Sequence, residues 1–289
     1  MQPRIDIIHY EGNTISVLRL DLPDPVSDGN KFFKLKYNFE EMKQKGQKRL
    51  LTFGGAYSNF IAAVSIGGKQ NGIETAGIIR GNELNADSNS VLRFANENGM
   101  RLHFVSREEY DRRYDEAYQK MLKEKFSVDV VLPEGGSNEL AVKGCAEILS
   151  EQTDFADVIF CPVGTGATLA GIISSAKAHQ TIIGVAVLNG KEYLENEVRK
   201  FLHGKNVRAQ WKIDHDHTFG GYGKSNEELR SFIRQIKSEL RIPLDEVYSG
   251  KCFSAMLEKI KGATFRGKKL LFVHTGGYGF NEEIQLSPI

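Results

Sequence analysis

The stretch DVIFCPVGTGATLAGIISSAKAH, residues 157–179, decides the fold class. It opens with Asp157–Val163, an apolar run typical of a strand that is covered on both faces. A glycine-containing loop follows, and it consists of Gly164, Thr165, Gly166, Ala167 and Thr168. From residue 167 to residue 179 the composition favours a helix. A strand, a short loop and a helix in this order predict one unit of a parallel sheet.

The same alternation continues on both sides of this segment. Strand-like runs are predicted at Leu50–Phe53, Thr75–Ile79, Leu102–Val105, Asp129–Leu132, Asp157–Val163, Thr181–Leu188 and Lys269–His274. Helix-like stretches are predicted at Ser58–Gln70, Ser88–Glu97, Glu108–Phe126, Asn138–Glu151, Ala167–His179, Glu192–Leu202, Asn226–Leu240 and Cys252–Lys261. Strands that alternate with helices predict an α/β fold built on parallel sheet.

Composition narrows the class of protein further. The chain has 289 residues, enough for one large domain or two smaller ones. Its 38 Lys and Arg against 37 Asp and Glu give a net charge of +1, which argues against nucleic-acid or membrane partners. The cysteines Cys145, Cys161 and Cys252 are widely spaced and odd in number. This spacing argues against a disulfide framework and predicts a reducing, cytoplasmic location.

The loop at 164–168 predicts a site for a single phosphate, because backbone amides at a helix N-terminus favour an anion. A dinucleotide site would need GxGxxG or GxGxxA and an acidic residue at the end of the next strand. Here the sixth position is Leu169, and the next strand ends in Val187–Gly190 without an acidic residue. The loop also lacks the lysine of a Walker motif. These departures disfavour NAD and ATP as ligands of this loop.

A second glycine loop, GGAYSN, occupies residues 54–59 between a predicted strand and a predicted helix. Glycines allow the backbone to approach a ligand beyond the carboxyl end of a strand. Ser58 and Asn59 would add side-chain donors there. The alternative is that Ser58 or Asn59 only caps the helix.

Lys31, in the segment SDGNK of residues 27–31, has two interpretations. It is either a solvated surface lysine or the anchor of an aldehyde cofactor. A phosphate loop together with an anchoring lysine is what pyridoxal 5′-phosphate requires. Two more segments, DEVYSGK at 245–251 and FVHTGG at 272–277, end apolar runs with small and hydroxyl residues.

Together these segments resemble the pyridoxal-phosphate family of 1-aminocyclopropane-1-carboxylate deaminase and D-cysteine desulfhydrase. The matching segments lie in the order GNKFFKLKY, TFGGAYSN, GTGAT, GGYGKSNEE, VYSGK and FVHTGG, and they span residues 29–277. The resemblance implies the tryptophan-synthase-like architecture (fold type II), with two open, twisted, mostly parallel sheets flanked by helices. It also implies a larger cofactor-binding domain of residues 1–36 and 151–289, a smaller inserted α/β domain of residues 37–150, and a homodimer.

The resemblance assigns cofactor contacts residue by residue. Lys31 matches the lysine that bonds covalently to the cofactor, and Asn59 matches an asparagine that faces its phenolic oxygen. The phosphate loop comprises Gly164, Thr165, Gly166, Ala167 and Thr168. Thr275 falls where related enzymes place a threonine near the pyridine nitrogen, and Ser249 is the other hydroxyl expected there.

The same resemblance assigns catalytic roles to four residues. Lys31 is the first candidate for the base and Ser58 the second. Tyr222 and Tyr248 match active-site tyrosines, which would protonate a leaving group or hold the substrate carboxylate. The implied substrate is a small amino acid, with D-amino acids among the candidates, and the implied products are a keto acid and ammonia.

Three departures from the family pattern bear on the substrate. Ser249 stands where the deaminase has an acidic residue directly after its second tyrosine. A hydroxyl there would leave the pyridine nitrogen mostly neutral, which favours β-elimination over cyclopropane ring opening. Tyr57 stands where the family usually has Gln or a smaller residue, and Phe60 stands where it usually has His or Gln. We expect both to reshape the substrate pocket.

Three other functions stay open at this point. The first is 1-aminocyclopropane-1-carboxylate deaminase activity itself. The second is a nicotinamide-dependent dehydrogenase, disfavoured by the missing acidic residue. The third is a non-catalytic ligand-binding or regulatory protein. No metal site is predicted, because the H-x-H in residues 214–217 lacks a third ligand at suitable spacing.

Glycine makes up 29 of the 289 residues, above the usual ~7%. We expect the clustered glycines to converge on one cofactor cleft. They are Gly29, Gly54, Gly55, Gly164, Gly166, Gly220, Gly221, Gly223, Gly250, Gly276 and Gly277.

Overall fold

The strands form a six-stranded and a four-stranded sheet in the computed structural model, which describes residues 3–22 and 29–276. The six-stranded sheet has the order β1 (Arg4–Tyr10), β2 (Asn13–Arg19), β10 (Leu270–His274), β7 (Val158–Val163), β8 (Thr181–Ala186) and β9 (Gln210–Asp214). The four-stranded sheet has the order β5 (Arg101–Val105), β4 (Glu74–Arg80), β3 (Arg49–Gly55) and β6 (Val130–Leu132). All neighbouring strands are parallel except β1 and β2.

Each sheet belongs to one of two compact units. The first unit comprises the described residues 3–22, 29–33 and 142–276 and contains the six-stranded sheet. The second comprises residues 34–141 and contains the four-stranded sheet. The chain passes from one unit to the other within helix α1 (Asn30–Gln44) and again within helix α6 (Glu139–Cys145).

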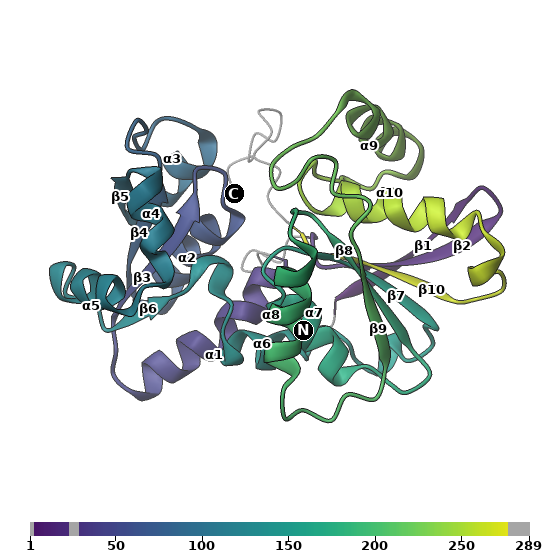
Figure 1. Cartoon of the computed structure of the whole chain (residues 1–289), viewed down its shortest axis with the longest axis horizontal. Coiled ribbons are helices and arrows are strands. Elements are labelled where there is room, and N and C mark those ends of the chain that lie inside the picture. The colour runs from purple at the N-terminus through teal and green to yellow at the C-terminus, as the bar shows by residue number, and fades with distance from the viewer. Residues whose placement is uncertain (1–2, 23–28, 277–289) are drawn as a thin grey trace. The chain divides into compact units, whose positions relative to one another are not determined.

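In the first unit, helices cover both faces of the sheet, and Figure 1 shows α10 on one side and α7 on the other. The helices after α6 are α7 (Ala167–Ser175), α8 (Lys191–Leu202), α9 (Glu227–Leu240) and α10 (Ser249–Ile260), with short 3₁₀ turns at Glu151–Thr153 and Ala263–Phe265. Phe160 and Phe272 from the strands pack against Phe253 and Met256 from α10 in one apolar cluster. Every residue of β7 is buried, because the strand is covered on both faces.

In the second unit, successive residues of one strand contribute to opposite cores. Leu50 of β3 belongs to the cluster that includes residues of α1, of α2 (Asn59–Asn71) and of α3 (Ser90–Glu97). Leu51 of the same strand belongs to the cluster with residues of α4 (Arg107–Asp111) and α5 (Glu116–Lys125). This alternation follows from the period of two in a strand. Short 3₁₀ turns lie at Arg112–Tyr114 and Glu134–Gly136.

The seven predicted strands are all present, and the prediction of an α/β fold with two mostly parallel sheets flanked by helices is confirmed. Three strands were not predicted, namely β1, β2 and β9. The five buried residues of β2, at positions 15–19, pair in parallel with β10, about 250 residues further on, so their burial depends on a long-range partner. Helix α1 was not predicted either.

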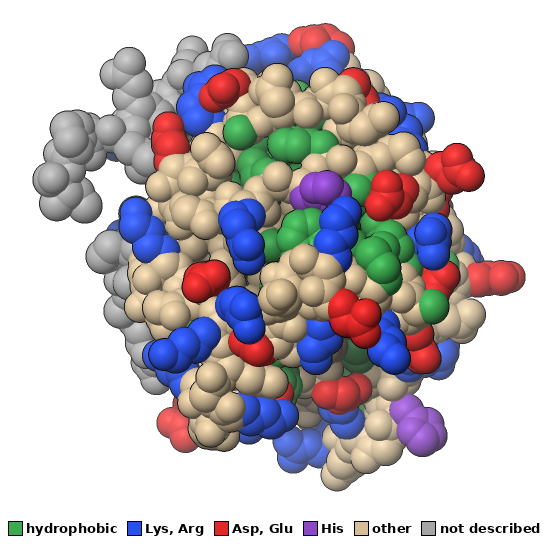
Figure 2. All heavy atoms as spheres, turned by 90° about the vertical axis from the view of Figure 1, so that its left-hand side faces the viewer, with side chains coloured by type: hydrophobic (Ala, Val, Ile, Leu, Met, Phe, Trp, Pro, Cys, Tyr) green, Lys and Arg blue, Asp and Glu red, His purple; other side chains and the backbone are tan. Residues whose placement is uncertain are grey.

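One predicted helix, Glu108–Phe126, is wrong because it is divided into α4, a 3₁₀ turn and α5. Asp115 interrupts it: its backbone is extended, and its carboxylate accepts the amides of Ala117 and Tyr118 at 2.8 and 3.2 Å. A side chain that caps a new helix ends the preceding one. Within this segment only Tyr110, Tyr118 and Leu122 are buried, so the segment presents a largely solvated, charged face. Figure 2 shows basic and acidic side chains interspersed on the face of the molecule that it presents.

Among the described residues, no helix is both long and apolar enough to cross a bilayer. Ser27, Asp28 and Gly277, which belong to predicted site segments, lie outside the described residues.

Candidate active site

Asn30 holds the beginning of α1 against the carboxyl ends of β10 and β7. Its backbone amide donates to the carbonyl of Thr275 at 2.9 Å, and its Nδ2 donates to Thr168 Oγ1 at 2.8 Å. The residue before it must be small: a Cβ on Gly29 would lie 2.2 Å from the carbonyl oxygen of Thr275. Gly29 also has a φ of 61°, which favours glycine. This close approach places the first turn of α1 at the edge of the sheet where parallel α/β proteins bind ligands.

The amine of Lys31 is held by the same asparagine. Lys31 Nζ donates to Asn30 Oδ1 at 2.6 Å, and Lys31 is only 8% exposed. Nζ also lies 5.5 Å from the centre of the Tyr248 ring. The structure therefore shows a buried amine with an amide and an aromatic ring around it. Lys31 is therefore not a solvated surface lysine.

The GTGAT loop connects β7 with α7 in the same unit. Gly166 has a φ of 86° and precedes the first residue of α7, and a Cβ there would lie 3.2 Å from Val198 Cγ2. A Cβ on Gly164 would lie 3.2 Å from Cε1 of Tyr248. Ala167 and Thr168 begin the helix, and the first amides of a helix have no acceptor within it. The loop thus offers an anion a helix N-terminus with little side-chain obstruction.

The Asn30–Thr168 hydrogen bond connects the amine and the loop directly. One residue, Asn30, therefore contacts both Lys31 Nζ and the side chain at the beginning of α7. The Lys31 amine and the GTGAT loop together would suit a ligand that carries an aldehyde and a phosphate on one small ring. The residues present fit pyridoxal phosphate: Lys31 would hold its aldehyde carbon, and residues 164–168 would hold its phosphate.

Two tyrosines form a pair, and one of them, Tyr248, lies beside the amine. The rings of Tyr222 and Tyr248 meet edge to face with centroids 6.0 Å apart, and their hydroxyl oxygens are 3.3 Å apart. Tyr248 is partly buried, whereas Tyr222 is 48% exposed. The structure therefore brings together the two predicted tyrosines, 26 positions apart in sequence, and places the ring of one of them, Tyr248, beside Lys31 Nζ.

The two predicted hydroxyls at the pyridine nitrogen are placed differently. Ser249 is buried at the beginning of α10, where its hydroxyl donates to the carboxylate of Asp245 and accepts the Asp245 amide at 2.7 Å. Asp245 in turn accepts the amides of Val247 and Tyr248. Thr275 is 3% exposed at the end of β10, and its hydroxyl forms no hydrogen bond with any residue in the described part of the chain. The proton of Ser249 is engaged in the turn, whereas the hydroxyl of Thr275 is not.

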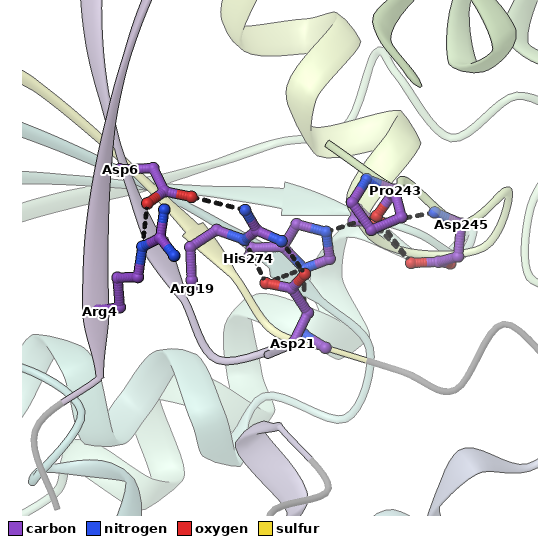
Figure 3. Close-up of polar contacts among 9 residues, drawn as sticks. Arg4, Asp6, Arg19, Asp21, Pro243, Asp245 and His274 are labelled. Carbon is purple, nitrogen blue, oxygen red and sulfur yellow. Dashed lines mark hydrogen bonds and ion pairs between the residues drawn. The ribbon is translucent and has the colours of Figure 1, made fainter. Parts of the chain in front are cut away.

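A buried polar network fixes the strand end that carries Thr275. Figure 3 shows Arg19 between Asp6 and Asp21, at 2.6 and 2.7 Å, with His274 beside Asp21. His274 Nε2 lies 2.7 Å from the carbonyl oxygen of Pro243 and must donate to it, so Nδ1 accepts the amide of Gly276 at 3.3 Å. These bonds tie β2, β10 and the segment before α10 together within the first unit.

Ser58 and Asn59 lie in the second unit, at the beginning of α2. Ser58 is the N-cap of α2, and its hydroxyl accepts the amide of Ile61 at 3.4 Å, so the capping interpretation of this residue holds. Tyr57, just before it, is 75% exposed. Phe60 is 2% exposed and lies in the apolar core, with ring atoms 2.3 and 2.5 Å from where a Cβ on Gly136 would stand. Phe60 is thus a core residue, contrary to the expectation that it shapes a substrate pocket.

Sequence reasoning missed three residues of this constellation, namely Asn30, Asp245 and Lys251. Asn30 stands between two residues that were singled out, and a polar amide next to an anchoring lysine is the signal for it. Asp245 begins the DEVYSGK segment three residues before Tyr248, which is the spacing of a capping side chain. Lys251 donates from Nζ to the carbonyls of Thr218 and Gly221, in the segment that carries Tyr222, at 2.8 Å each. It carries no local signal, because these partners are 33 and 30 positions away in sequence.

The fold and the site together define an α/β enzyme with a lysine and an anion cradle for a phosphorylated aldehyde cofactor. The sequence matches the profile of the family described as pyridoxal-phosphate dependent enzyme over residues 15–276. The chain belongs to this family, and its cofactor is pyridoxal 5′-phosphate.

Similar proteins agree with this assignment. A Thermotoga maritima protein, named provisionally as a 1-aminocyclopropane-1-carboxylate deaminase, is 31% identical over 92% of this chain and 89% of its own. The bifunctional mitochondrial D-cysteine desulfhydrase/1-aminocyclopropane-1-carboxylate deaminase of Arabidopsis thaliana is 28% identical over 92% of this chain and 73% of its own. The crystal structure of an ACC deaminase homologue shares the fold, with a TM-score of 0.78 and 24% identity over 96% of this chain and 92% of its own.

Proposed function

We propose that this protein is a lyase that eliminates a β-substituent from a small amino acid, as in desulfhydration of D-cysteine, and releases a keto acid and ammonia. One juxtaposition carries the proposal: Lys31 Nζ contacts Asn30, and Asn30 contacts the beginning of α7. Tyr248, whose hydroxyl lies 3.3 Å from that of Tyr222, is next to the same amine. The names of the relatives support the substrate class.

Lys31 would act as the base that takes the proton from the substrate Cα. Its Nζ is buried and is held by Asn30 Oδ1, which limits the directions in which it can accept a proton. The bound cofactor would supply the electron sink for the charge that develops at Cα. Ser58 would be the second candidate for the base, and its use as a helix cap leaves its proton available for another acceptor.

The tyrosine pair would handle the leaving group. Elimination removes the Cα proton and the β-substituent, and the substituent departs more easily if it is protonated. Tyr248 is close to Lys31 and Tyr222 is within 3.3 Å of Tyr248, so a proton donated by one hydroxyl can be replaced from the other. The alternative role of the pair is to hold the substrate carboxylate.

Ser249 and Thr275 bear on the reaction type. Since the Ser249 hydroxyl is engaged with Asp245, we assign Thr275 as the neutral hydroxyl toward the pyridine nitrogen. Neither residue is an acid that would hold a proton there. A weaker electron sink suits elimination of a good leaving group better than opening of a cyclopropane ring.

For the second unit we propose only what the resemblance assigns. Asn59 would face the phenolic oxygen of the cofactor. The exposed Tyr57, which departs from the family pattern, would reshape the substrate pocket. In this proposal the two units correspond to the larger cofactor-binding domain and the smaller inserted domain. We also propose that the protein is a cytoplasmic homodimer, which size-exclusion chromatography with light scattering would test for the oligomeric state.

The second candidate function is deamination of 1-aminocyclopropane-1-carboxylate. The names of the Thermotoga and Arabidopsis relatives favour it. Both functions use the same Lys31, phosphate loop and tyrosines, so the substrate alone separates them.

A panel of amino acids tests the proposal. Purified protein loaded with pyridoxal phosphate is given D- and L-cysteine, other β-substituted amino acids and 1-aminocyclopropane-1-carboxylate, and keto acid release is measured. We expect turnover of a β-substituted substrate, and none for Lys31→Ala. Rapid turnover of the cyclopropane substrate alone would establish the second candidate. Retained cofactor with no turnover of any substrate would contradict both.

A further inference from the structure

Lys251 is a buried cation that takes part in none of the ion pairs among the described residues. It is 0% exposed, on the first turn of α10. Its Nζ lies 2.8 Å from the carbonyl oxygens of Thr218 and Gly221 and 3.4 Å from that of Val187. An ammonium has three donors, and these three acceptors match them. The ammonium therefore donates its hydrogen bonds to backbone carbonyls rather than to a carboxylate.

The carbonyls that Lys251 binds belong to the segment that carries Tyr222. Residues 218–224 form no helix or strand, and four residues in them have positive φ: Phe219, Gly220, Gly221 and Gly223. Two backbone bonds within the segment, Gly221 N to Thr218 O and Lys224 N to Gly221 O, use the same two carbonyls that Lys251 contacts. Such a glycine-rich segment has many accessible conformations. The ammonium selects one of them by binding two of its carbonyls from the interior.

The same turn of α10 also positions the partner of Tyr222. Tyr248 immediately precedes α10, and Lys251 is the third residue of the helix. One helical turn thus presents the Tyr248 ring beside Lys31 and, three residues on, the ammonium that binds the Tyr222 segment. The two hydroxyl oxygens are 3.3 Å apart.

We propose that Lys251 is a positioning residue that holds Tyr222 against Tyr248 by binding the carbonyls of Thr218 and Gly221. This inference rests on the proposed function of the tyrosine pair. Burial lowers the pKa of Lys251 to about 8, and the charge of Asp245 opposes that shift. The side chain is therefore an ammonium at neutral pH, with all three donors available.

A double-mutant cycle tests whether Lys251 acts through Tyr222. Lys251→Met removes the ammonium and keeps an unbranched side chain of similar length. Whichever parameter Tyr222→Phe changes, kcat or KM, we expect Lys251→Met to change the same one. The change should be about 10- to 100-fold, which is the range that loss of hydrogen bonds from a charged group produces. In a protein that already carries Tyr222→Phe, adding Lys251→Met should change that parameter by less than a further factor of about three. Effects that multiply would overturn the inference.

A matched control and a graded variant accompany the cycle. Lys261→Met makes the same substitution at a lysine whose side chain is 65% exposed, and it should leave kcat and KM unchanged. Lys251→Gln keeps two N–H donors on a shorter side chain, and it should fall between the wild type and Lys251→Met. If Lys251→Gln is as impaired as Lys251→Met while both remain folded, donation to the carbonyls is not what matters.

Hydrogen exchange gives a readout that needs no turnover. In the protein with and without cofactor, Lys251→Met should accelerate exchange in peptides covering residues 218–224 by at least about tenfold, and peptides from the second unit should be unaffected. Unchanged protection of residues 218–224 would overturn the inference. If no amino acid is a substrate but this acceleration is seen, the proposed function has failed and the positioning role has not.

Discussion

The side chain of Asn30 donates a hydrogen bond of 2.8 Å from Nδ2 to Thr168 Oγ1, 138 positions further along the chain. The oxygen of the same side-chain amide, Oδ1, accepts a hydrogen bond of 2.6 Å from Lys31 Nζ. Asn30 therefore uses both ends of its amide, one on the covalent anchor and one on the beginning of the helix that would bind the phosphate. Its backbone amide is used as well, on Thr275.

Replacing Asn30 should weaken cofactor binding more than it weakens the fold. Asn30→Ala leaves Thr168 and the buried Lys31 amine without their partner, which costs about 1–3 kcal/mol for each. We expect the dissociation constant for pyridoxal phosphate to rise at least about tenfold in a titration followed by visible absorbance. Asn38→Ala is the matched control, because Asn38 is also buried in α1 and bonded through its amide, to Lys34 O and Asn138. Equal loss of affinity in both variants would contradict this role.

Gly166→Ala should impair the phosphate loop. A non-glycine residue at a φ of 86° is strained by about 1–2 kcal/mol, and the new Cβ would stand 3.2 Å from Val198 Cγ2. Gly204→Ala provides the comparison, since Gly204 has a φ of 74° and no atom within 4 Å of the added Cβ. Both variants should lower the melting temperature, but only Gly166→Ala should lower affinity for the cofactor.

Ser249 and Thr275 should respond differently to loss of their hydroxyls. Ser249→Ala removes the donor to Asp245 at the beginning of α10, and we expect a loss of about 1–2 kcal/mol in the free energy of unfolding with little change in the cofactor spectrum. Thr275→Val should shift the visible absorbance and lower kcat, because its hydroxyl is not engaged by a described residue. Thr275→Ser should restore both. A spectral change in Ser249→Ala alone would reverse the assignment.

His217 should make stability depend on pH in the neutral range. Its hydrogen bond to Asp214 at 2.9 Å, helped by Glu258 at 3.1 Å, raises the pKa of His217 above its ordinary 6.5. A raised pKa stabilises the fold fully below that ordinary value, and the contribution is lost as pH rises through the higher folded-state pKa. Urea unfolding of wild type and His217→Gln, measured from pH 5 to 9, should differ by about 1–3 kcal/mol at the acid end and converge at the alkaline end. A difference that grows with pH would refute this.

The sequence alone determined the local units of the fold. The seven predicted strands and most helices follow from short-range periodicity, and the glycines at 29, 164 and 166 follow from turns that exclude a side chain. Lys31 and the GTGAT loop were recognisable because an anchor and a phosphate loop each have a local sequence pattern.

Tertiary structure decided how these units combine. Three long-range contacts decide this: β2 pairs with β10, Asn30 contacts Thr168, and Lys251 binds the Tyr222 segment. They join residues 30 to about 250 positions apart. Tertiary structure also decided that the Ser249 hydroxyl donates to Asp245 and that Phe60 lies in the apolar core. Periodicity reports which face of an element is buried, but it does not report what the buried atoms meet. Those contacts arise only when distant strands and helices pack together, which is why the sequence predicts the candidate anchor and only the fold shows what holds it.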